Sequence, residues 1–198
     1  MAADFENAQK NILAKLEKYL PEDLFYHGLH HTRDVYGAAV RIAEYEGISD
    51  EDMKLLHIAT FYHDAGFITH YKNHEDAGCE QVREELPAFG FTESQIEKIC
   101  GMILATKIPQ SPKNKLEEII CDADLDYLGR DDFKPIGQTL FDELKVYVKM
   151  NDEKQWNRIQ LNFLKQHSYF TEFARKHREK EKQKHLAEII RIVESYED

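Results

Sequence analysis

The chain has 198 residues, with 37 acidic and 26 basic side chains that give a formal net charge of −11. This length suits one domain with its own core, so we expect a single domain over residues 1–198. The acidic balance argues against general nucleic-acid binding, which needs a basic face. Three widely spaced cysteines are typical of reduced thiols. With neither a signal-peptide pattern nor a long apolar run, the sequence predicts a cytoplasmic protein without membrane contact.

Apolar residues recur at helical spacing along nearly the whole chain, without strand-like alternation. Pro21 and Gly47 are stop signals, Ser49 is an expected N-cap, and Thr92 with Gln95 forms a capping-box pattern. We expect Gly66 to end the third helix. The expected helices cover residues 12–20, 35–45, 50–65, 74–86, 93–103, 114–128, 133–148 and 156–196, the last with a break near residue 170. The sequence therefore predicts an all-α fold.

Histidine and aspartate recur where these helices begin or end. His63 and Asp64 stand side by side in the apolar stretch "FYHDAGF", and similar groups occur in "YHGLHHT" (26–32), "NHED" (73–76) and "CDADLDYLG" (121–129). An unpaired charge in an apolar setting costs several kcal/mol. A divalent metal ion binds neutral imidazoles and ionised carboxylates together. The pattern therefore favours a metal site that draws on several of these segments.

The ordered set of residues resembles the HD-domain metal-dependent phosphohydrolases. In that family a histidine, a distant His-Asp doublet and a final aspartate bind metal. The resemblance assigns these roles to His31, His63, Asp64 and Asp124, which are separated by intervals of the family's usual scale. It implies an HD-domain helical bundle with a core at about 26–130, followed by additional C-terminal helices at about 131–198.

Two of these positions have alternatives within the sequence. For the last ligand, Asp124 fits the family's usual form best, because an aliphatic residue follows its "AD" pair, and Asp122 is the second choice. About 200° of helix separates the two side chains, so both cannot easily face one ion. For the first ligand, His31 is favoured over His30 and His27 because the family's histidine commonly precedes threonine.

The chain also departs from the family pattern near the doublet. Residues 65–68 are not acidic, although some relatives with nucleotide substrates carry acidic residues there. Thr106 and Lys107 stand where many relatives have a further histidine. These departures weaken the transfer of a particular nucleotide substrate or of a full two-metal site. His74 is a candidate for a second metal site or for contact with the phosphate.

The resemblance implies hydrolysis of a small phosphate monoester or diester, with a nucleotide as one option, by metal-activated water. Asp64 would both bind the metal and orient the water. Lys107 and Arg33 are the candidates for holding phosphate charge, with Lys72 and Arg130 as further cations near the motifs. The divalent ion is Mn, Fe, Mg, Ni, Co or Zn, and a homo-oligomer is compatible with the sequence. Two alternatives are a signalling or ligand-binding module that retains metal with little turnover, and a two-iron oxygenase.

One charged stretch invites a different interpretation. "ARKHREKEKQKH" (174–185) is rich in basic residues, as a nucleic-acid patch would be. Acidic residues are interleaved with the basic ones, which favours a solvent-exposed helix face. We therefore expect this stretch to be solvated.

Overall fold

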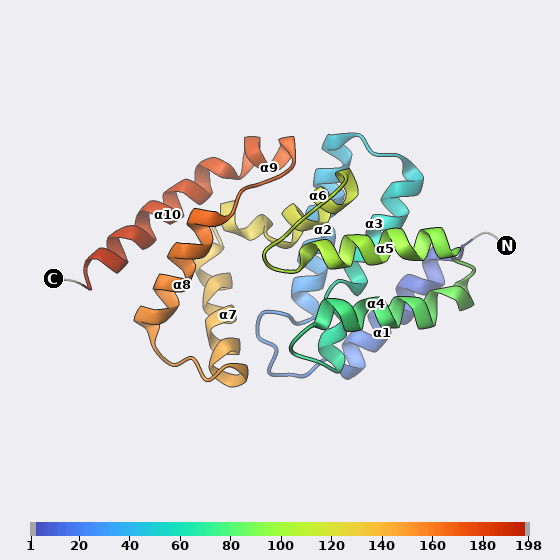
Figure 1. The fold of residues 1–198 in the computed structure, drawn as a ribbon, viewed down its shortest axis with the longest axis horizontal. Coiled ribbons are helices and arrows are strands. Elements are labelled where there is room, and N and C mark those ends of the chain that lie inside the picture. Colours follow the sequence, from blue (N-terminus) through green and yellow to red (C-terminus); the bar gives the residue numbers. More distant parts are fainter. Residues whose placement is uncertain (1–2, 197–198) are drawn as a thin grey trace.

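The computed structural model describes residues 3–196, and this range forms helices without any β-strand (Figure 1). The predicted all-α fold is confirmed. The α-helices are α1 (Phe5–Tyr19), α2 (Leu29–Glu46), α3 (Asp50–Tyr62), α4 (His74–Glu85), α5 (Glu93–Thr106), α6 (Lys115–Asp124), α7 (Phe133–Tyr147), α8 (Glu153–Gln166), α9 (Glu172–His177) and α10 (Glu179–Glu194). Three short 3-10 helices join them: η1 (Ala65–Ile68), η2 (Leu86–Phe89) and η3 (Asp126–Gly129).

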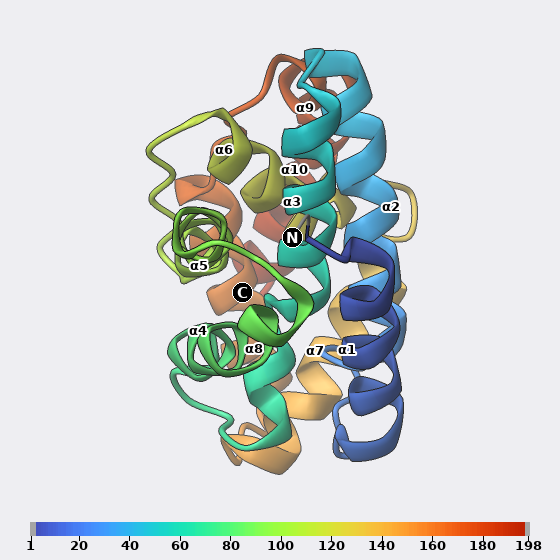
Figure 2. The same cartoon turned by 90° about the vertical axis from the view of Figure 1, so that its right-hand side faces the viewer.

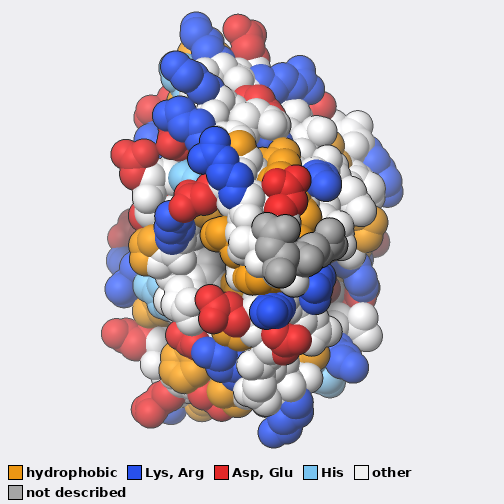
Figure 3. All heavy atoms as spheres, turned by 90° about the vertical axis from the view of Figure 1, so that its left-hand side faces the viewer, with side chains coloured by type: hydrophobic (Ala, Val, Ile, Leu, Met, Phe, Trp, Pro, Cys, Tyr) orange, Lys and Arg blue, Asp and Glu red, His pale blue; other side chains and the backbone are white. Residues whose placement is uncertain are grey.

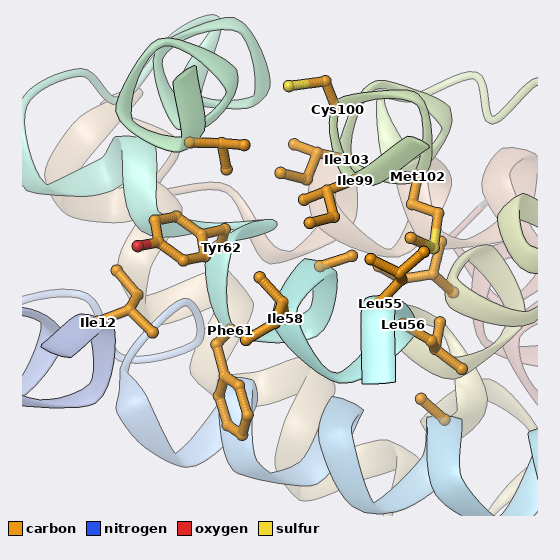
Figure 4. Packing of buried hydrophobic residues seen from close by; sticks show 14 of the residues in the cluster. Ile12, Leu55, Leu56, Ile58, Phe61, Tyr62, Ile99, Cys100, Met102 and Ile103 are labelled. Atoms are coloured by element: carbon orange, nitrogen blue, oxygen red, sulfur yellow. The ribbon is translucent and has the colours of Figure 1, made fainter. Parts of the chain in front are cut away.

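Helix α3 lies at the centre of the first six helices, with α1 and α2 on one side and α4 and α5 on the other (Figures 1 and 2). Its residues from Leu55 to Tyr62 are nearly all buried, so it is apolar around most of its circumference. Figure 4 shows Tyr62 between Ile12 of α1 and Ile103 of α5, with Ile58 facing Ile99. This core fixes the end of α3, where the His-Asp doublet stands.

Several helix ends agree with the sequence signals. Ser49 caps α3 by accepting a hydrogen bond from the Asp52 amide, and Thr92 with Gln95 forms the full capping box of α5. Gly47 ends α2 with a φ of 69°, a left-handed conformation that favours glycine.

Two predicted helix ends were wrong. Gly66 does not cap α3, which ends at Tyr62; it lies inside η1, where a Cβ atom would come within 1.9 Å of the His74 carbonyl oxygen. Glycine is therefore required there because η1 and the start of α4 approach each other closely. The predicted helix over 114–128 ends earlier, at Asp124, and continues as η3.

The C-terminal helices surround a second hydrophobic cluster, which includes Leu128 of η3, Leu164 of α8 and Ile189 of α10. On the face of the molecule shown in Figure 3, positive and negative side chains are interspersed. The prediction that residues 174–185 form a solvated face was wrong for three side chains, because Ala174, Lys182 and His185 are buried. Lys182 is 1% exposed and donates to the His167 carbonyl, and His185 is buried against the Arg130 carbonyl.

The three cysteines are buried and free, as the sequence predicted. Within residues 3–196 we find no helix with the length and apolar character needed to cross a bilayer.

Candidate metal centre

Four side chains converge where α2, α3 and α6 meet. His31 lies in the first turn of α2, His63 and Asp64 directly follow α3, and Asp124 is the last residue of α6. His31 Nε2 is 3.1 Å from Asp124 Oδ1 and 3.4 Å from Asp64 Oδ2. His63 Nε2 is 3.1 Å from Asp64 Oδ2 and 3.7 Å from Asp124 Oδ1. The structure thus brings together all four residues that the sequence selected.

The donor set fits a divalent ion. Asp64 Oδ2 is buried and has no hydrogen-bond partner among residues 3–196, although two imidazole nitrogens lie close to it. His63 Nδ1 lies 2.8 Å from the Thr60 carbonyl oxygen, which can only accept, so Nδ1 donates. In the neutral imidazole, Nε2 then presents its lone pair to the cluster. Two imidazoles with two carboxylates form a common environment for a transition-metal ion.

The same groups influence each other's protonation in the metal-free protein. Burial lowers the pKa of His63, but the carboxylates of Asp64 and Asp124 outweigh burial and raise this pKa to about 9. Burial raises the pKa of Asp64, yet the charged His63 beside it holds that pKa well below its ordinary value. A proton on His63 therefore offsets the two carboxylates, and it must leave before His63 can bind a metal ion.

Asp122, the second choice for the last ligand, points away from this cluster. It is fully buried and accepts hydrogen bonds from the amides of Phe170 and Thr171 and from the Thr171 hydroxyl, at 2.7–3.1 Å. Two residues further along α6, Asp124 faces His31 instead. Asp122 thus anchors the segment between α8 and α9 to α6, and it explains why the predicted break near Phe170 lies there.

Asp122→Ala is expected to reduce the free energy of unfolding by about 2–4 kcal/mol, because it leaves buried donors unpaired. Asp124→Asn should instead remove metal binding with a smaller loss of stability. Urea unfolding and metal content, measured on both variants, check this pair. A loss of metal by Asp122→Ala, with metal retained by Asp124→Asn, would reverse the assignment of the last ligand.

Two further histidines extend the site beyond the first four residues. His74, at the start of α4, has Nε2 3.4 Å from Asp64 Oδ1, on the other side of that carboxylate from His63. His27 stacks on Phe67 and pairs through Nδ1 with Glu143 of α7 at 2.5 Å. The sequence identified His74 as a site candidate, but it gave no signal for Glu143. That residue lies 116 positions from His27 within an ordinary amphipathic helix.

The proposed phosphate-binding cations are exposed or paired with acidic side chains. Arg33 and Lys72 are exposed. Lys107 pairs with Asp76 at 2.8 Å, and both side chains are about half exposed. Arg130 is held by Asp34 and by two more carboxylates of its own segment. Arg33 is exposed and Lys107 lies against an acidic neighbour, so their roles in holding phosphate stay predictions.

A cavity of about 270 Å³ opens beside the cluster. One end is lined by Asp64, His74, Glu75 and Asp124, and also by the ring of His27. The other end lies against α7 and α8. A small molecule in this cavity would reach two of the four converging carboxylate and imidazole side chains directly.

The family model described as HD domain matches residues 28–126, half of the chain. The helical fold and the His/Asp cluster agree with this match, and the chain belongs to the HD domain family. Its fold is shared with the crystal structure of a predicted HD superfamily hydrolase from an uncultured Thermotogales bacterium, with a TM-score of 0.60. That match has 20% identity and covers 94% of this chain and 92% of the other. No curated protein gives a significant match.

Proposed function

We propose that this protein is a metal-dependent phosphohydrolase acting on a small phosphate ester. The observation that carries the proposal is the convergence of His31, His63, Asp64 and Asp124 around a buried, unpartnered carboxylate oxygen. Membership of the HD domain family supports the same reaction class. A bound divalent ion would polarise a phosphoryl oxygen and lower the pKa of a bound water.

Side chains and a backbone carbonyl of the protein have the remaining roles. Asp64 Oδ2 faces His31 and His63, whereas Oδ1 faces His74 at 3.4 Å. We assign to Asp64 Oδ1 the orientation of the attacking water. We assign to His74 a contact with the phosphate of the ester, because it lines the cavity beside Asp64 and burial lowers its pKa, which favours the neutral ring. The Thr60 carbonyl keeps the His63 ring oriented towards the cluster.

The test is phosphate release from a panel of phosphate monoesters and diesters, with Mn²⁺, Fe²⁺, Mg²⁺, Ni²⁺, Co²⁺ and Zn²⁺ supplied in turn. We expect turnover of at least one ester with at least one ion, and loss of that turnover on chelation. Restoring the ion should restore the rate. If every ester stays intact with every ion, while metal content shows a loaded site, the hydrolase proposal is wrong.

That negative result would favour one of two other functions. A module that binds metal and ligand without turnover would still be stabilised by the ion. A two-iron oxygenase would hold two irons per chain and consume oxygen, which iron analysis and an oxygen electrode detect. Stabilisation by the ion without turnover therefore indicates the binding module, whereas two irons per chain with oxygen consumption indicate the oxygenase.

A further inference from the structure

The cavity beside the metal centre has one charged end and one apolar wall. The carboxylates and histidines lie at the end of the cavity that is formed by helices α4 and α6, by the residues directly after α3 and by the segment before α2. The opposite side is built from η3, α7 and α8, and we call six of its residues the apolar wall: Phe133, Leu140, Leu144, Trp156, Ile159 and Phe163. Gln160 is the polar side chain that α8 contributes to the lining.

This cavity holds no lysine or arginine among its lining residues within 3–196. Asp64, Glu75 and Asp124 place three carboxylates at the charged end. One divalent ion does not fully offset them, and the side chains of Lys107 and Arg130 are paired with Asp76 and Asp34. A substrate with several phosphates would therefore add negative charge without a protein cation to receive it. A single phosphate held by the metal adds less negative charge than a chain of phosphates.

The apolar wall also limits what can be attached to that phosphate. The cavity volume of about 270 Å³ lies near the lower end of the range of ~300–1,000 Å³ for ligand pockets. A ribose placed against this wall would bury several hydroxyl groups beside six apolar side chains, with Gln160 of α8 and Tyr127 of η3 as the polar residues on that side, and unpaired buried hydroxyls oppose binding. Two apolar side chains, Ile108 and Ile159, line the cavity while remaining 54% and 39% exposed, so apolar surface continues to its edge.

Resting on the proposed hydrolase function, we propose that the substrate is a phosphate monoester of an apolar alcohol. Its phosphate lies at the Asp64 and Asp124 end, and its alkyl or aryl group lies against the apolar wall. This arrangement places the only highly charged part of the substrate next to the ion. It also removes the substrate's hydrocarbon and the facing side chains from water.

The first experiment compares methyl phosphate, butyl phosphate and adenosine 5′-monophosphate as substrates, with the ion that gives turnover. Burying a methylene contributes ~0.8 kcal/mol, which is about fourfold. Over the three added methylenes we expect kcat/KM to rise about 60-fold from methyl to butyl phosphate. Adenosine monophosphate should be a poorer substrate than butyl phosphate.

Ile159→Asp places a charge on the apolar wall at a side chain that is already 39% exposed, so folding should tolerate it. We expect it to reduce the butyl-to-methyl ratio of kcat/KM at least fivefold. The matched control is Val146→Asp, because Val146 is also 39% exposed but does not line the cavity. It should leave the ratio unchanged.

A binding measurement tests the inference without requiring turnover. Trp156 is the sole tryptophan of the sequence and belongs to the apolar wall, so its fluorescence reports on the cavity. Butylphosphonate, which cannot be hydrolysed as an ester, should change this fluorescence and bind about 60-fold more tightly than methylphosphonate, by the same methylene increments. Ile159→Asp should weaken butylphosphonate selectively.

The outcomes separate the two proposals. Turnover without any dependence on chain length, or a preference for adenosine monophosphate, overturns the apolar-alcohol inference and leaves the hydrolase intact. Tight butylphosphonate binding without turnover of any ester retains the inference about the cavity and rejects the hydrolase. Equal binding of the two phosphonates rejects the inference whatever the turnover.

Discussion

Asp64→Ala is expected to lower kcat/KM for any hydrolysed ester by at least about a thousandfold, or ~4 kcal/mol of transition-state stabilisation. The substitution removes the carboxylate that contacts both His31 and His63, together with the oxygen that faces His74. Metal binding and orientation of water would then be lost at the same time. A substitution that weakened only substrate binding would change KM more than kcat.

The same variant should lose the stabilisation that metal gives to the folded protein. An ion at a hundredfold excess over its Kd adds about 2.7 kcal/mol to the free energy of unfolding. Wild-type protein should therefore show a higher Tm with Mn²⁺ than with chelator, and Asp64→Ala should show much less difference. Asp131→Ala is the matched control, since Asp131 is an exposed aspartate in the turn before α7. Equal metal-dependent Tm shifts in all three proteins would contradict the assigned centre.

The centre was predictable because its residues carry strong local signals. The His63-Asp64 doublet lies in an apolar segment, where its charge needs partners, and the fold supplies His31 and Asp124 as those partners. The family resemblance selected Asp124, and helix geometry added that Asp122 and Asp124 cannot easily face the same ion. Residues two positions apart on a helix face different sides, and α6 indeed directs Asp122 to Thr171 and Asp124 to His31.

The roles of single charged residues were not predictable in the same way. Lys107 follows a helix near the motifs, but tertiary packing places Asp76 beside it. Lys182 belongs to a stretch that looks solvent-exposed, yet it faces the second hydrophobic cluster and the His167 carbonyl. Tertiary packing determines which group a long charged side chain contacts. A contact with a group that is distant in the sequence leaves no local signal.

The apolar wall was also only partly predictable from the sequence. The spacing of Leu140 and Leu144 in α7, and of Trp156, Ile159 and Phe163 in α8, predicts an apolar face on each helix. Periodicity indicates that such a face packs against something. It does not indicate that part of the face remains open beside a metal centre.

Glu143→Ala is expected to reduce the free energy of unfolding by about 3–5 kcal/mol, the usual cost of breaking a buried ion pair by removing one partner. The Glu143 carboxylate is fully buried and accepts from the amides of Tyr26 and His27, at 2.8 and 3.0 Å. It also accepts from the Tyr71 hydroxyl at 3.2 Å and pairs with the His27 ring. This one side chain of α7 therefore holds the segment before α2 against the C-terminal helices. Glu143→Gln keeps an acceptor oxygen and should cost less, about 1–3 kcal/mol.

The pH dependence distinguishes the ion pair from a purely steric effect. Burial lowers the pKa of His27, but Glu143 together with Asp64 and Asp124 outweighs burial, and the net pKa is raised above 6.5. Burial raises the pKa of Glu143, but His27 outweighs it and the net pKa falls below 4.5. The stabilisation from His27 is fully present below pH 6.5 and is lost as the pH rises through its raised folded pKa. The stabilisation from Glu143 is present above pH 4.5 and is lost as the pH falls through its lowered folded pKa.

The cost of Glu143→Gln should therefore be greatest between pH 4.5 and 6.5 and decline on the alkaline side. Urea unfolding from about pH 4.5 to pH 9, in the presence of chelator, measures it. Asp142→Asn is the control, because Asp142 is the neighbouring carboxylate on α7 and its side chain is 42% exposed. It should change stability by less than about 0.5 kcal/mol. A cost of Glu143→Gln that stays constant from pH 5 to pH 9 would show that hydrogen bonds to the backbone and to Tyr71, rather than the charge of His27, account for the role of Glu143.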